Sequence, residues 1–172
     1  MFYRGPGAGA GSLFGAIGAA ATVNADHSAK GELLALMDKE HIDIAQILLE
    51  QTEAKLASAP DTEKRVKALP GARLHIEILM YGLVKTQLFS STMYPTVKVK
   101  MTLTRDGDPK PVWSESEWVA TAASENDKGF SYDEYMKDPG KIRIVWTNVT
   151  KIAASRLINS LQLKLIYPGS NK

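Results

Sequence analysis

The stretch that decides the fold runs from residue 96 to residue 121 and reads TVKVKMTLTRDGDPKPVWSESEWVAT. Apolar and polar residues alternate over its first nine positions, which is the period of a strand with one buried face. The apolar members are Val97, Val99, Met101 and Leu103. Asp106-Gly107 then supplies the positive φ angles of a tight reversal. Because a second strand-like run follows from Val112 to about Thr121, the stretch predicts a β-hairpin.

A third strand is expected before this hairpin. Residues 74–81 alternate in the same way, and the pattern puts four side chains on one face: Leu74, Ile76, Ile78 and Met80. The three strands are close in sequence and therefore predict an antiparallel meander. A short strand is also expected at Phe2–Arg4, where Gly5-Pro6-Gly7 would end it.

Helices are expected on both sides of these strands. Ser28 is a candidate N-cap for one helical piece, and Asp43 is expected to open the next helix, while residues 61–71 read as a connecting loop. Ser131 with Glu134 three residues later forms a capping box, and Asp138-Pro139 is expected to open a long helix. Residues 161–167 alternate like a final strand, although continuation of the helix to Leu165 is the competing interpretation.

These elements predict an α+β fold. A sheet with one apolar face and amphipathic helices is arranged most simply as a two-layer sandwich, with a mainly antiparallel sheet of three to five strands and helices on one face. The chain has 172 residues, which suits a single domain over residues 1–172.

Residues 5–25 form a Gly/Ala-rich N-terminal segment without charged side chains until Asp26. Small residues recur at every fourth position, at Gly7, Gly11, Gly15 and Ala19. On a helix this spacing makes a smooth stripe, with Phe14 on the apolar face beside it, where another backbone can approach closely. The stripe would pack on the protein's own sheet or on a partner helix or membrane surface, and an irregular loop is the third reading.

Composition excludes several function classes. The chain has no cysteine, which removes thiol nucleophiles and cysteine-ligated metals, and its three histidines are too widely spaced for an all-protein zinc site. A net charge of +2 is too even for nucleic-acid binding by electrostatics alone. The glycine-rich run from Gly5 to Ser12 lacks the lysine of a phosphate-binding loop. No cofactor, metal or nucleic acid is therefore expected.

The strand expected from Val112 to about Thr121 carries the remaining candidates. Glu115 and Glu117 project from one side of it and could act as an acid/base pair, although a water-facing sheet surface is the simpler interpretation. Trp113 and Trp118 must face opposite sides because they are five residues apart. An exposed tryptophan could anchor an interface, and Trp113 is grouped with the two glutamates as a candidate interaction surface.

The chain resembles small periplasmic lipoproteins of Gram-negative cell envelopes. The resemblance rests on the tract from Gly9 to Ile17, the helix Ile44–Leu56, the strand Arg73–Tyr81 and the hairpin joined by Asp106-Gly107 with Trp113 after its turn. It closes with a terminal helix that ends Ala154-Ser155-Arg156-Leu157. The resemblance implies a two-layer α/β domain shared with envelope-assembly factors and an exported protein that is lipid-anchored on an N-terminal cysteine. Because this chain has no cysteine, either the anchor precedes Met1 or the implied localisation does not hold. It implies no catalytic residues.

Together these observations predict a protein that is not an enzyme. We expect a periplasmic, outer-membrane-associated protein that acts by protein–protein interaction, as an assembly or accessory factor, with an envelope protein or a second copy as its partner. The candidate surface comprises Gly7, Gly11, Phe14, Gly15, Trp113, Glu115 and Glu117. The alternative is a carrier or binder of an apolar small molecule or lipid. A hydrolase that uses the two glutamates is the third hypothesis.

Overall fold

A computed structural model describes residues 2–4, 23–85, 90–120 and 126–167. Its sheet contains β1 (Phe2–Arg4), β2 (Arg73–Lys85), β3 (Thr92–Thr104), β4 (Trp113–Val119) and β5 (Phe130–Ser131). The spatial order is β1-β2-β3-β4, and β5 pairs with the start of β3. β1 is parallel to β2, whereas β2, β3 and β4 run antiparallel to their neighbours. The predicted meander and the short first strand are therefore confirmed.

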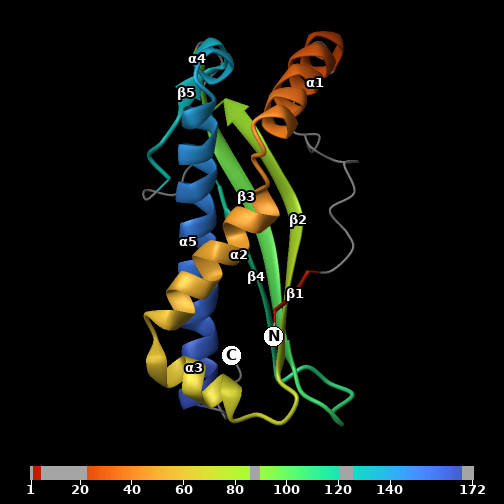
Figure 1. Cartoon of the computed structure of the whole chain (residues 1–172), viewed down its shortest axis with the longest axis vertical. Coiled ribbons are helices and arrows are strands. Elements are labelled where there is room, and N and C mark those ends of the chain that lie inside the picture. The colour runs from red at the N-terminus through yellow and green to blue at the C-terminus, as the bar shows by residue number, and fades with distance from the viewer. Residues whose placement is uncertain (1, 5–22, 86–89, 121–125, 168–172) are drawn as a thin grey trace.

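The helices are α1 (Val23–Lys39), α2 (Ile44–Ala57), α3 (Pro60–Lys67), α4 (Tyr132–Lys137) and α5 (Pro139–Ile166). α5 runs along the sheet and contacts β3 and β4. α2 lies on the same side of the sheet, where it crosses and contacts α5 (Figure 1). α1 and α4 lie together at one end of the molecule and α3 lies at the other (Figure 1). The predicted α+β arrangement, with helices on one face of a mainly antiparallel sheet, is confirmed.

The core lies between the sheet and α5. Every second residue of β3 is fully buried, from Val97 to Leu103, as the alternation in the sequence predicted. α5 supplies the opposite wall through buried side chains on successive turns: Ile142, Val145, Trp146, Val149, Ala153, Leu157 and Leu161. Burial of this apolar area is the dominant stabilising term. It also divides the sheet into a helix-covered inner face and an outer face.

A β-bulge in β2 changes which residues reach the inner face. The register with β3 shifts between Ile78 and Met80. Tyr81 pairs with the inward-facing Val97, whereas Met80 pairs with Lys98 on the outer face. The prediction that Met80 shares a face with Leu74 is therefore wrong, because the extra residue at the bulge reverses the alternation beyond it.

Three sequence-based boundaries are corrected. Residues 60–67 form α3 and not a loop: Pro60 occupies the first turn, and the acidic start and basic end of α3 complement the helix dipole. The last segment continues α5 to Ile166, because Leu157 and Leu161 stay in the buried stripe while Leu163 faces solvent. Ser28 lies inside α1 and does not cap it.

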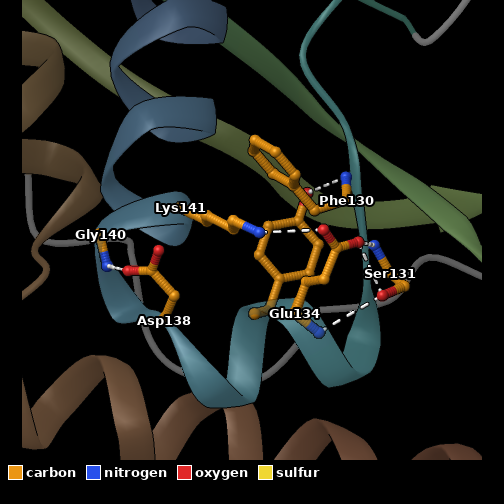
Figure 2. A network of polar contacts seen from close by, with 7 residues as sticks. Phe130, Ser131, Glu134, Asp138, Gly140 and Lys141 are labelled. Carbon is orange, nitrogen blue, oxygen red and sulfur yellow. Dashed lines mark hydrogen bonds and ion pairs between the residues drawn. The ribbon is translucent and has the colours of Figure 1, made fainter.

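The predicted helix starts at Asp43, Ser131 and Asp138 are confirmed. The carboxylate of Asp43 accepts hydrogen bonds from the backbone N–H groups of Ala45 and Gln46. Asp138 Oδ1 accepts from Gly140 N at 3.0 Å and thereby caps α5 (Figure 2). Each contact satisfies backbone donors that a helix leaves unpaired at its N-terminus.

The junction of α4 and α5 contains a polar network around Glu134 (Figure 2). Glu134 Oε2 accepts from Ser131 N at 2.9 Å, and Glu134 Oε1 pairs with Lys141 Nζ at 2.9 Å. The hydrogen bond from the Ser131 backbone, the Lys141 ammonium and the Ser131 hydroxyl lower the pKa of Glu134 to about 2. Lys141 Nζ also lies 4.8 Å from the centre of the Phe130 ring. The network fixes the angle at which the chain enters α5.

Candidate functional site

The outer face of the sheet carries a row of three side chains across three strands. Lys98 in the central strand β3 pairs with Met80 of β2 on one side and with Trp118 of β4 on the other. Trp118 is 49% exposed. Directly opposite residues of adjacent strands project from the same face, so the three side chains stand side by side. We call this set the outer row.

Trp118 is held in place by the sheet beneath it. Its indole Nε1 donates to Thr96 Oγ1 at 2.9 Å, and the Thr96 hydroxyl in turn donates to the carbonyl oxygen of Val119 at 2.9 Å. Thr96 belongs to the outer face but is only 6% exposed. Because the polar edge of the indole is already bonded, what Trp118 offers to solvent is mainly apolar ring surface on a rigid support.

Charged and hydroxyl side chains border the outer row. Lys100 pairs with Glu77 of β2 and with Ser116 of β4 in the strand register. Thr102 Oγ1 and Ser114 Oγ lie 2.9 Å apart. An exposed aromatic ring within a polar border is the usual composition of a transient protein interface.

Trp113 does not belong to this surface. It is 7% exposed and pairs with Leu103 on the inner face. Its inclusion in the candidate surface is therefore wrong. A five-residue separation placed the two tryptophans on opposite faces, as expected, but left open which one faces solvent. The parity of Val119, which is also buried, would have identified Trp118 as the exposed one.

Glu115 and Glu117 also lie on the inner face, at the edge where β4 meets α5. Arg156 Nη1 of α5 donates to Glu117 Oε1 at 2.6 Å. Ser160 Oγ, one turn further along α5, donates to Glu115 Oε2. Glu115 stays exposed to solvent at this edge, as the simpler interpretation expected, whereas Glu117 is partly buried against α5. They connect the edge strand to the long helix, and these partners become visible only when α5 is packed on the sheet.

The other members of the predicted surface are Gly7, Gly11, Phe14 and Gly15. All four lie outside the residues that the structure describes. The proposal that a small-residue stripe contacts a partner helix stays a prediction.

A pocket of about 410 Å³ opens on the opposite, helix-covered side, between the end of α1, the start of α2 and β2. Its apolar lining includes Met37, Ile42, Ile44 and Ile78. Its polar lining consists of Asp38, His41, Asp43 and Tyr81. A concave apolar wall with a few converging polar groups is the general form of a small-molecule site.

The polar groups of the pocket are positioned by local structure. His41 has a φ of +51° at the turn after α1, where Ile42 N bonds to Met37 O at 2.8 Å and closes the helix end. Tyr81 packs edge-on against Trp146, with ring centroids 5.8 Å apart. Burial and the negative charge of Asp43 raise the pKa of Tyr81.

No group of three or more His, Asp or Glu side chains in the described part of the chain has the arrangement of a metal site. Among the same residues, no helix combines the length and the apolar character needed to cross a bilayer.

Comparison with known proteins finds similarity in three-dimensional structure only. No family model and no curated protein matches the sequence. The fold is similar to that of a protein from Caulobacter crescentus CB15 described as a putative lipoprotein, with 14% identity and a TM-score of 0.42 over 76% of this chain and 88% of that chain. It is also similar to a Xanthomonas campestris protein of family DUF330, with 14% identity and a TM-score of 0.33 over 57% of this chain and 48% of that one. The description of the first of these proteins agrees with the kind of protein that the sequence resembles.

Proposed function

We propose that the protein is a non-enzymatic component of the cell envelope that acts by binding another envelope protein through the outer face of its sheet. The observation that supports this proposal is Trp118, a half-exposed aromatic ring whose polar edge is bonded to Thr96. Binding energy at interfaces concentrates on aromatic residues of this kind. An anchor that is already ordered also loses little conformational entropy when a partner covers it.

The neighbours of Trp118 fit the same role. Lys98 and Lys100 stand beside it in β3, and Glu77 lies across from Lys100. Charges at the border of an interface select partners and steer their approach more than they add affinity. The periplasmic, outer-membrane location of the protein is part of this proposal.

Site-specific photocrosslinking tests the proposal. A photoreactive residue replaces Ser116, which is exposed on β4 next to Trp118, in cells that produce the full chain. We expect one discrete adduct that fractionates with the envelope, and a loss of about tenfold in its yield when Trp118→Ala is added, because tryptophan anchors dominate binding. An adduct of twice the chain mass would identify a second copy as the partner.

The control places the same photoreactive residue at Lys151, on the exposed side of α5. Equal adducts from both positions, adducts insensitive to Trp118→Ala in a variant that stays folded, or recovery of monomer alone would each overturn the proposal.

A second candidate function is the binding of a small apolar molecule. The pocket between α1, α2 and β2 is the observation that favours it, because the volume of about 410 Å³ falls within the usual range of ligand sites.

A further inference from the structure

The pocket lies on the inner side of the sheet, away from the outer row. We infer that it binds small amphipathic cations: molecules with an apolar body and a positively charged head such as an ammonium group. This inference rests on the second candidate function, the binding of a small molecule, and narrows it to one chemical class.

The apolar body is accommodated by buried residues from three elements. Met37 of α1, Ile42 of the connecting turn and Ile44 of α2 are all buried and line the pocket together with Ile78 of β2. These side chains already belong to the packed core or contact it, so the wall is largely formed before a ligand arrives. A formed apolar wall favours a ligand by removing its apolar surface from water.

The positive head is selected by charge. Asp38 and Asp43 line the pocket and are exposed to solvent, and the described lining contains no lysine or arginine. The Tyr81 phenol adds a neutral polar group to the same lining. Arg143 approaches the same turn from α5, where its Nη2 donates to the carbonyl oxygens of Glu40 and His41 at 3.3 and 3.4 Å. Its single positive charge offsets only part of the charge of the two carboxylates. A cation is therefore attracted to this opening and an anion is repelled.

Three probes with one apolar body isolate the effect of the head. Isothermal titration calorimetry of the full chain with 4-phenylbutylamine, 4-phenyl-1-butanol and 4-phenylbutyrate compares a cation, a neutral molecule and an anion. We expect the amine to bind about tenfold more tightly than the carboxylate, with the alcohol between them, because each exposed carboxylate contributes a small term of opposite sign to the two ions.

Two variants assign the effect to this pocket. The double substitution Asp38→Asn with Asp43→Asn removes both charges while asparagine still caps α2, and should bring the three affinities within about twofold of one another. Ala45→Phe fills the pocket and should weaken all three probes about tenfold or more, whereas Ala54→Phe, on the exposed side of the same helix, should not.

The outcomes distinguish failure of the cation preference from failure of the pocket as a binding site. Equal binding of all three probes that Ala45→Phe abolishes would overturn the cation preference and leave a binder of apolar molecules. Failure of every probe to bind, or equal affinities in Ala45→Phe and Ala54→Phe, would overturn the pocket as a binding site altogether. A preference for the amine that the double asparagine variant retains would also contradict the inference.

Discussion

His41 shows how one residue sets the geometry of the α1–α2 turn. Its φ of +51° is a left-handed conformation that a residue with a Cβ adopts at a cost, and glycine adopts freely. Two contacts of the turn offset this cost: Ile42 N donates to Met37 O at the end of α1, and Asp43 caps the start of α2. The same conformation places His41 in the lining of the pocket.

Replacing this residue tests the strain directly. We expect His41→Gly to raise the free energy of unfolding by about 0.5–1 kcal/mol relative to His41→Ala, since alanine keeps the positive-φ penalty and glycine removes it. Urea denaturation of the two variants measures the difference. An alanine variant as stable as the glycine variant would show that the turn is not strained at His41.

At the residue scale, the sequence predicted which side chains share a face of a strand better than it predicted the partners of those side chains. The spacing of Glu115 and Glu117 correctly put them on one face of a strand, but the Arg156 and Ser160 contacts join residues 39 and 45 positions apart. Local spacing carries no information about such pairs. The same holds for the residues of the pocket. His41 and Asp43 stand two positions apart in the sequence, whereas their approach to Tyr81 depends on tertiary packing.

The capping box at the start of α4 makes stability depend on pH at the element scale. The pKa of Glu134 is lowered from 4.5 to about 2 because the folded chain stabilises its charged form. A carboxyl group with a lowered folded pKa contributes stability above its unfolded pKa and loses it as the pH falls toward the folded value. The contribution of Glu134 is therefore complete above about pH 4.5 and lost by about pH 2.

Glu134→Gln removes this charge but leaves a residue that suits a capping box. We expect its melting temperature to lie below that of the original chain at pH 7, and the two to converge between pH 4.5 and pH 2. Thermal unfolding followed by circular dichroism across this range gives the comparison. The matched control is Glu50→Gln, on the exposed side of α2. A pH dependence of Glu134→Gln identical to that of Glu50→Gln would contradict the assignment.

The sequence predicted element boundaries correctly where a capping residue was present, and wrongly where composition alone was used. Asp43, Ser131 and Asp138 mark helix starts because each side chain bonds to nearby backbone N–H groups. The polar composition of residues 61–71 predicts a loop, yet the charges of residues 60–67 suit a short exposed helix, in which Lys67 Nζ lies 2.7 Å from Glu63 Oε1. Alternation over only seven residues at 161–167 fits both a strand and a helix.

At the scale of the whole molecule, the sheet separates two surfaces with different chemistry. The inner face carries the core, the contacts to α5 and the pocket, and the outer face carries the outer row with Trp118. The fold class was predictable because strict alternation in β3 requires one buried face, and a helix with a continuous apolar stripe is its simplest cover. The spacing of the two tryptophans did not by itself assign Trp118 to the outer face; that assignment needed the parity of Val119 as well.

The separation of the two faces is tested most directly by quenching tryptophan fluorescence with acrylamide. The chain has three tryptophans, of which Trp113 and Trp146 are buried and Trp118 is half-exposed. We expect the original chain to show a readily quenched, red-shifted component that Trp118→Phe removes, leaving blue-shifted and shielded emission. If the original chain lacked that component, or the emission that remains in Trp118→Phe were still readily quenched, the assignment of Trp118 to an open outer face would be contradicted.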